Sequence, residues 1–206
     1  MPPNARWLSA DLGAHADAFM RLAESASSAH DAFAFRQAAE AREFYEALYR
    51  GGGADFAPPA GRLLLVDDEP AGMLALVEPG VLRRRRLVGG VVMARAQRSR
   101  SDPALTERLR RAAGTLATSS ETDGYLSRLA VHPAMAGRGL GRALLAEALA
   151  ATRALGLERC VLEVADGNER AIALYQAAGF KAIGEASTTD PETGRRLGYL
   201  HMARTV

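Results

Sequence analysis

The stretch His132–Leu145, HPAMAGRGLGRALL, places three glycines within five residues, 137–141, and then begins an apolar run. Glycine costs backbone entropy, so such a cluster indicates either positive φ angles or a partner that approaches the main chain closely. One interpretation is a tight turn into a helix. The other is a set of backbone N–H groups that hold an anion at the N-terminus of that helix. The residues alone leave both open.

The chemistry around these glycines suits phosphate better than a neutral ligand. Arg138 and Arg142 add positive charge to the N-terminal end of the expected helix dipole. Two common phosphate-binding patterns are nevertheless excluded. A dinucleotide fingerprint that starts at Gly139 would need a third glycine where Leu144 stands, and no Lys-Ser or Lys-Thr pair follows for a P-loop.

Composition limits the classes of protein to which the chain can belong. It has 206 residues, with 26 Lys and Arg against 24 Asp and Glu, which is typical of one soluble globular domain and too weakly basic to argue for nucleic-acid binding. The arginine run 83–86 is expected to be a solvated turn, with an anion or nucleic-acid patch as the less favoured alternative. Four scattered histidines and one cysteine predict no metal site.

The same survey predicts a cytoplasmic protein. The single cysteine, Cys160, excludes an internal disulfide, fits a reducing compartment and is expected to be a small core residue rather than a catalytic thiol. The first residues do not form a signal-peptide pattern. No apolar stretch approaches the roughly 18 residues of a membrane span.

Apolar periodicity predicts alternating strands and helices on both sides of the glycines. Downstream we expect a helix over 142–155, a strand over 158–165, a helix that begins near Asn168 and ends at Gly179, and two strands over 180–187 and 198–205. A strand over 125–133 precedes the glycines. Upstream we expect a short strand at Trp7, a helix through Phe19 that Asp11 caps, and a helix over 32–49 that ends at the glycines 51–53. A hairpin over 62–80, a strand over 85–97 and a helix over 105–116 are expected to follow. The mixture predicts an α/β or α+β domain with a mixed sheet.

Two segments together resemble the GNAT family of N-acetyltransferases. LAVHPAMAGRGLGRALL (129–145) resembles the family's acyl-CoA-binding motif, and LEVADGNERAIALYQAAGF (162–180) resembles the second half of its core. The close resemblance covers residues 123–183. It implies a central, mostly antiparallel sheet with splayed parallel strands flanked by helices, and acetyl-CoA as co-substrate without a metal. One domain would then consist of 1–122 shaping the acceptor site, 123–183 binding acetyl-CoA, and a C-terminal hairpin over 184–206.

The resemblance also implies which residues bind acetyl-CoA. The backbone of the strand before the loop would pair with the pantetheine arm, and the loop N–H groups would wrap the pyrophosphate. Asn168 matches a pantetheine contact, with a helix N-cap as the alternative. These positions are Leu129, Ala130, Val131, Ala136, Gly137, Arg138, Gly139, Leu140, Gly141, Arg142, Asn168 and Tyr175. Ala136 departs from the Gln or Arg of the family, which removes a side-chain contact and keeps the N–H.

Two residues are implied as catalytic. Tyr175 matches the tyrosine that protonates the departing thiolate in many members, and a phenol of pKa about 10 can do so for a thiolate of pKa about 8.5. The alternative is a core tyrosine. Glu163 matches the proposed base of the N-terminal acetyltransferases of ribosomal proteins, to which the C-terminal core is similar; the alternative is a strand glutamate paired with an arginine. Weaker base candidates are Glu121, Asp123, His132, His201 and a chain of water molecules.

The activity implied is direct transfer of an acetyl group from acetyl-CoA to a primary amine, on a small molecule or a peptide. A backbone N–H near Val131 would polarise the thioester carbonyl. Three alternatives stay open at this stage: a different acyl-CoA donor, a hydroxyl acceptor, and a non-catalytic acyl-CoA-binding or sensor module. The resemblance also leaves a homodimer open.

Overall fold

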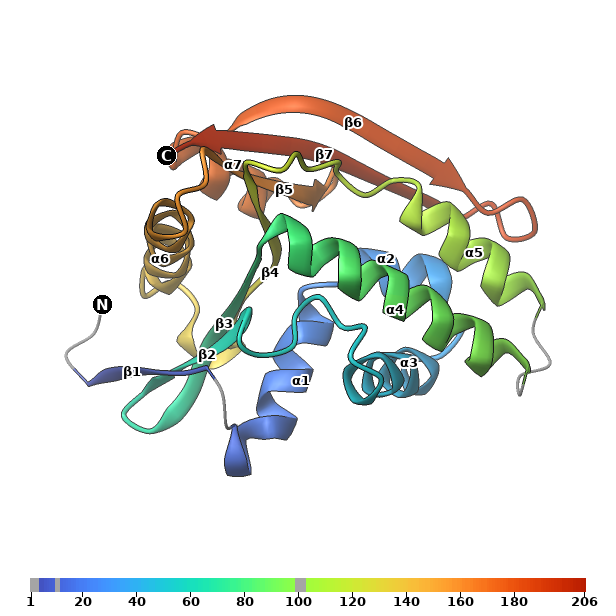
Figure 1. Ribbon diagram of the computed structural model, residues 1–206, viewed down its shortest axis with the longest axis horizontal. Coiled ribbons are helices and arrows are strands. Elements are labelled where there is room, and N and C mark those ends of the chain that lie inside the picture. Colours follow the sequence, from blue (N-terminus) through green and yellow to red (C-terminus); the bar gives the residue numbers. More distant parts are fainter. Residues whose placement is uncertain (1–3, 10–11, 99–102) are drawn as a thin grey trace.

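The computed structural model describes residues 4–9, 12–98 and 103–206, and within these ranges seven strands form one sheet (Figure 1). Its strand order is β1–β2–β3–β4–β5–β7–β6, and every neighbouring pair is antiparallel except β4 and β5. The strands are β1 Ala5–Leu8, β2 Gly61–Val66, β3 Glu69–Val77, β4 Asp123–Val131, β5 Arg159–Ala165, β6 Lys181–Thr189 and β7 Arg196–Thr205. This mixed, mostly antiparallel sheet confirms the predicted fold class.

Helices cover both faces of the sheet (Figure 1). They are α1 Ala16–Ser25, α2 Ser28–Ala34, α3 Ala38–Arg50, α4 Pro79–Arg98, α5 Pro103–Ala113, α6 Leu140–Ala154 and α7 Glu169–Ala177, with 3-10 turns at Gly13–His15 (η1) and Pro133–Met135 (η2). Asp11, the predicted cap of α1, lies outside the described residues.

Strand alternation explains why two separate cores form. In β2, Leu63 and Leu65 pack with α1, α3 and α5, whereas Leu64 and Val66 point the other way and pack with α6 and α7. Successive side chains of a strand face opposite sides of a sheet, so an uninterrupted apolar strand is buried on both faces. The sheet is therefore the middle layer of three, with α1–α5 on one face and α6 and α7 on the other.

The helix predicted over 32–49 is two helices. Phe35 and Gln37 adopt extended backbone angles between α2 and α3. Both flanking segments carry helical apolar spacing, so the break is not visible in the periodicity. The glycine run that follows ends α3 at Gly51, as predicted. This short extended link carries Phe35, Arg36 and Gln37 along one wall of a cavity described below.

The strand predicted over 85–97 is wrong, and so is the solvated turn predicted for Arg83–Arg86. Both segments belong to the long helix α4. β-branched Val88, Val91 and Val92 around a Gly-Gly pair favour a strand, but tertiary packing decides otherwise. A Cβ on Gly53 would lie 2.7 Å from the backbone of Gly89, so the glycines allow the loop after α3 to pass directly against the helix.

Arg85 fixes α4 to the rest of the molecule. Its buried guanidinium donates hydrogen bonds to the backbone carbonyls of Asp55, Ala57 and Pro58 at 2.9, 3.0 and 3.1 Å. The neighbouring Arg84 is exposed. Within the arginine run 83–86, Arg85 therefore has a structural role that the sequence does not distinguish.

None of the helices in the described ranges combines the length and the apolar character that a membrane crossing needs.

Substitution of Arg85 by Met should destabilise the protein by about 2–4 kcal/mol, because three carbonyls lose a charged donor inside the structure. Urea unfolding measures the change. Arg84→Met, the matched control, should stay within about 0.5 kcal/mol of the wild type. Equal effects of the two substitutions would contradict the structural role of Arg85.

Candidate active site

The parallel strands β4 and β5 separate part-way along their length. They pair only from Asp123–Arg159 to Tyr125–Val161, although β4 continues to Val131 and β5 to Ala165. On its other side β4 stays paired with β3 to the Gly72–Val131 pair. Within the described part of the chain, the edge of β4 that faces β5 thus has no strand partner over residues 126–131.

A β-bulge marks the point of separation. Leu76 pairs with Leu126 while the adjacent Ala75 pairs with Arg128, so Ser127 is an extra residue in β4. A bulge bends its strand and increases the local twist, which turns the rest of β4 away from β5. The unpartnered edge includes Leu129, Ala130 and Val131, the residues expected to offer their backbone to a ligand.

An ion pair closes the end where the strands still meet. Asp123 is fully buried and accepts two hydrogen bonds from Arg159, at 2.8 and 2.9 Å, and one from the Ser120 N–H at 2.7 Å. Burial alone would raise the pKa of Asp123, but these bonds outweigh it and lower the pKa. Asp123 is therefore engaged in holding β4 to β5.

The other weak base candidates are also engaged elsewhere. Glu121 pairs with Arg83 on the surface. His132 begins η2, where its Nδ1 accepts the Ala134 N–H. His201 lies on β7 with its Nε2 2.8 Å from the Thr115 carbonyl oxygen.

The glycine loop leads into α6 with the geometry that its composition suggested. Gly137 and Gly139 have φ of +78° and +76°, and Gly139 is the N-cap of α6. No side chain of the described residues caps this helix, and its first intrahelical bond runs from the Ala143 N–H to the Gly139 carbonyl. The N–H groups of Leu140, Gly141 and Arg142 precede that bond and lie at the positive end of the helix dipole.

Ala136 differs from expectation. Its N–H donates to the Pro133 carbonyl at 3.1 Å, so this position offers a ligand neither a polar side chain nor an available N–H. Arg138 and Arg142 are exposed beside the helix N-terminus. The available donors therefore begin after Ala136.

Asn168 is the N-cap of α7, and Tyr175 lies within that helix. The Asn168 side-chain oxygen accepts the Ala171 N–H at 3.1 Å, so the N-cap alternative is realised. Tyr175 is buried beside Phe180 in the core under α6 and α7, and burial raises its pKa. Gly141 is packed close to Leu174, one residue before this tyrosine.

Glu163 sits on the opposite face of the sheet from Tyr175. Tyr125 OH donates to its Oε1 at 2.6 Å and the Ala117 N–H donates to its Oε2 at 3.3 Å. Among the described residues no arginine forms an ion pair with it, which differs from the alternative of a strand glutamate paired with arginine. Burial raises the pKa of Glu163, and the bonds from Tyr125 and Ala117 oppose that rise.

Sequence inspection missed the side chains that surround Glu163. Arg128 lies over the rings of Tyr45 and Phe56, with Nη1 3.9 Å from Asp55 Oδ1. Tyr199 follows from β7, two residues before His201. No motif or spacing links these positions, because only the fold brings their strands together.

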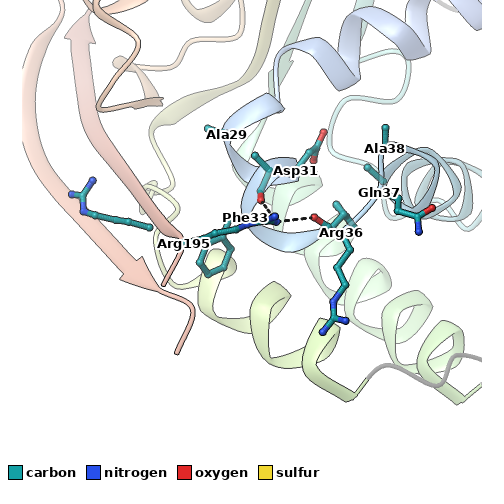
Figure 2. A pocket seen from close by; sticks show the side chains of 11 residues that line it. Ala29, Asp31, Phe33, Arg36, Gln37, Ala38 and Arg195 are labelled. Carbon is teal, nitrogen blue, oxygen red and sulfur yellow. Dashed lines mark hydrogen bonds between the residues drawn. The ribbon is translucent and has the colours of Figure 1, made fainter. Parts of the chain in front are cut away.

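Two cavities open beside this face. Figure 2 shows the larger, of about 690 Å³, between the α2–α3 link and the start of β7. There Arg195 donates to the carbonyls of Ala32 and Phe35 at 3.0 and 3.5 Å, which ties the C-terminal hairpin to α2 (Figure 2). The second, of about 470 Å³, borders Asn168, Asp166 and Gly198. The glycine loop, Tyr175 and Glu163 line neither cavity, but Phe33 of the larger one packs in the same cluster as Tyr199.

Across the described ranges, no group of three or more His, Cys, Asp and Glu side chains is placed to hold a metal ion.

Comparison with known proteins identifies the family. The model of the acetyltransferase (GNAT) family matches residues 21–180. This chain belongs to that family. A mycothiol acetyltransferase of Beutenbergia cavernae is 47% identical over 60 residues, which are 29% of this chain and 20% of the relative, so the match spans a fifth of the relative's length.

Solved structures of this acetyltransferase fold cover nearly the whole chain. An N-acetyltransferase from Staphylococcus aureus Mu50 aligns with a TM-score of 0.65 at 14% identity, over 97% of this chain and 100% of the other. The Salmonella typhimurium protein yncA, solved with its cofactor acetyl-CoA, aligns with a TM-score of 0.53 at 18% identity, over 98% and 94%. At these identities the likeness establishes the fold.

The environment of Glu163 generates a pH prediction. A carboxyl group whose pKa is raised by folding favours the native state at low pH, and that contribution is lost as the pH rises through the raised pKa. Glu163→Gln does not titrate, so its free energy of unfolding relative to wild type should increase with pH over this window. Urea unfolding from about pH 4 to pH 9 tests this. Glu69→Gln, on the exposed hairpin, is the matched control; a pH-independent difference for Glu163→Gln would contradict the prediction.

Proposed function

We propose that this acetyltransferase moves the acetyl group of acetyl-CoA directly to a primary amine of a small molecule or a peptide. The observation that carries the proposal is the separation of β4 from β5 beside the uncapped N-terminus of α6. Family membership and the acetyl-CoA-bound relative of the same fold support it.

The residues present fit acetyl-CoA at this place. Three N–H groups at the start of α6 need acceptors, and a pyrophosphate provides them together with a charge that the helix dipole favours. Gly137 and Gly139 leave open space where side chains would stand. The unpartnered edge of β4 at Leu129–Val131 suits the amide groups of a pantetheine arm, which would add to it as a strand does.

The proposed base, Glu163, and the proposed acid, Tyr175, lie on opposite faces of the sheet. Acetyl-CoA supplies a thioester as the acyl donor. Glu163 takes the proton from the attacking amine, and Tyr175 gives a proton to the departing sulfur. A backbone N–H near Val131 polarises the acyl carbonyl, and Asn168 reaches the pantetheine arm with its amide group while its oxygen caps α7.

Cys160 supports direct transfer rather than an acyl-enzyme. The thiol is buried in the core between the sheet and α6, and burial raises its pKa to about 12. Thiolate is the reactive form of cysteine, so this side chain stays protonated at neutral pH and out of reach.

We assign the acceptor to the face that carries Glu163. Arg128 and Tyr199 interact electrostatically with its carboxylate, and Phe33, which lines the larger cavity together with Asp31, packs in the same cluster as Tyr199. Tyr199, Phe33 and Asp31 lie outside 123–183, in the parts of the chain that we expect to shape the acceptor site, whereas Arg128 belongs to the acetyl-CoA-binding core. We place the protein in the cytoplasm as one domain, with a homodimer open and nucleic acid not expected among its partners.

Binding of acetyl-CoA tests the first half of the proposal. Isothermal titration should show one site, and Arg138→Gln combined with Arg142→Gln should weaken it about tenfold and reduce its dependence on salt, since two cations near the phosphates are lost. Arg153→Gln, in the last turn of the same helix, is the matched control. Unchanged affinity in the double variant would refute the assigned phosphate position.

Release of free CoA thiol with a panel of amines and peptides tests the second half. Tyr175→Phe should lower kcat about 100-fold under chemistry-limited conditions without weakening acetyl-CoA binding, because only the proton donor is lost. Tyr49→Phe, which removes the hydroxyl from a ring that stacks on Phe56, is the matched control. Tight binding with no thiol release for any acceptor would favour the sensor alternative.

A further inference from the structure

Both oxygens of Glu163 are held by donors from elsewhere in the chain. Tyr125, at the last pair before β4 and β5 separate, donates to Oε1 at 2.6 Å, and the Ala117 N–H donates to Oε2 at 3.3 Å. A carboxylate can accept about four hydrogen bonds, so lone pairs remain for a ligand. The two bonds fix the orientation of the carboxylate and leave some of its lone pairs free to accept further hydrogen bonds.

Tyr125 is itself immobilised. Its side chain is 1% exposed in a cluster with Val77, Val161 and Ala203. Arg86 of α4 places its guanidinium 5.2 Å from the ring centroid, within the range of a cation–π contact. The phenol therefore has one orientation, and that orientation points its hydroxyl at Glu163.

Groups on several elements face Glu163. They are Tyr125 and Arg128 of β4, Tyr199 and His201 of β7, Asp55 in the loop before β2 and the N–H of Ala117. Tyr175 of α7 interacts with Glu163 electrostatically from the opposite face of the sheet. Burial raises the pKa of the carboxyl group, and of the interactions that oppose this rise the Tyr125 bond is the largest, ahead of Ala117 and Arg128. Asp55 acts in the same direction as burial.

We propose that Tyr125 is a positioning residue for the acceptor half of the reaction, whose hydroxyl fixes the orientation of Glu163 so that this carboxylate can accept the amine proton. The proton moves from the amine nitrogen to a remaining lone pair of Glu163, and Tyr125 keeps its own. This inference rests on the proposed role of Glu163 as the base.

The hydrogen bond predicts the direction in which loss of the Tyr125 hydroxyl shifts the pH profile of kcat/KM. The bond favours the ionised carboxylate, so its removal makes Glu163 easier to protonate and moves the acidic limb of kcat/KM to higher pH. On the acidic side of the limb kcat/KM should fall about tenfold, the effect of losing one hydrogen bond to a charged group. On the alkaline side it should recover toward the wild-type value. A purely structural role would lower activity without moving the limb.

The experiment compares Tyr125→Phe with Tyr45→Phe. Tyr45 is also a buried tyrosine whose hydroxyl donates to a carboxylate at 2.6 Å, in this case Asp31 Oδ1, so the control removes an equivalent bond from a different acid. The pH profile is measured with the amine that is turned over fastest in the panel. Independently, protein labelled with 13C at the glutamate carboxyl carbon is titrated by NMR, with Glu163 assigned by its absence from Glu163→Gln.

We expect the Glu163 titration and the acidic limb to move together to higher pH in Tyr125→Phe and to stay in place in Tyr45→Phe. A Glu163 titration that is the same in Tyr125→Phe and wild type would overturn the inference. Full transfer by Glu163→Gln would instead refute the base in the proposed function, and the NMR titration distinguishes that failure from the first.

A second variant covers the case in which Tyr125→Phe does not fold. Replacement of Tyr125 by 3-fluorotyrosine keeps the ring and the hydroxyl and makes the phenol a stronger donor. The Glu163 titration should then move in the opposite direction, to lower pH. Absence of that movement would also count against the inference.

Discussion

Beyond the Tyr125–Val161 pair, β4 and β5 give up the backbone hydrogen bonds that a continuous sheet would make. Unpaired backbone groups inside a protein are costly, so this separation persists only because other contacts impose it. The extra residue at Ser127 bends β4, and the buried Asp123–Arg159 pair holds the strands together on the near side of the gap. The result is a wedge-shaped gap between β4 and β5, here called the wedge, which is closed at the Asp123–Arg159 end. The β4 backbone that borders the wedge is available to a ligand.

The two faces of that wedge differ in chemistry. On the α6–α7 face apolar packing surrounds Tyr175 and Cys160. On the other face, side chains with ionisable groups gather beneath α3 to α5, among them Glu163, Arg128 and Asp55. A protein that only needed stability would fill this second region with apolar residues, since buried charges cost solvation energy unless they are well paired. The presence of these ionisable side chains accords with the role that we propose for Glu163.

Much of this arrangement could be predicted from residues 123–183. The glycine loop, the helix after it and the Asn168 cap follow local rules of backbone conformation and capping, and each lies where the sequence placed it. The strand predicted over 85–97 failed because valines beside Gly89 and Gly90 favour extended structure locally. The contact between Gly53 and Gly89 that selects the helix is set by residues distant in the chain. Tyr125 and Arg128 escaped notice for the same reason.

The middle position of the sheet has a kinetic consequence. With Tyr175 on one face and Glu163 on the other, the proposed donor and acceptor approach the wedge from opposite sides and meet only at its centre. Neither molecule blocks the path by which the other leaves the site. In the direct transfer that we propose, both must be present before the acyl group moves, so turnover would pass through a ternary complex, and the sheet itself imposes no order on how that complex assembles or which product departs first.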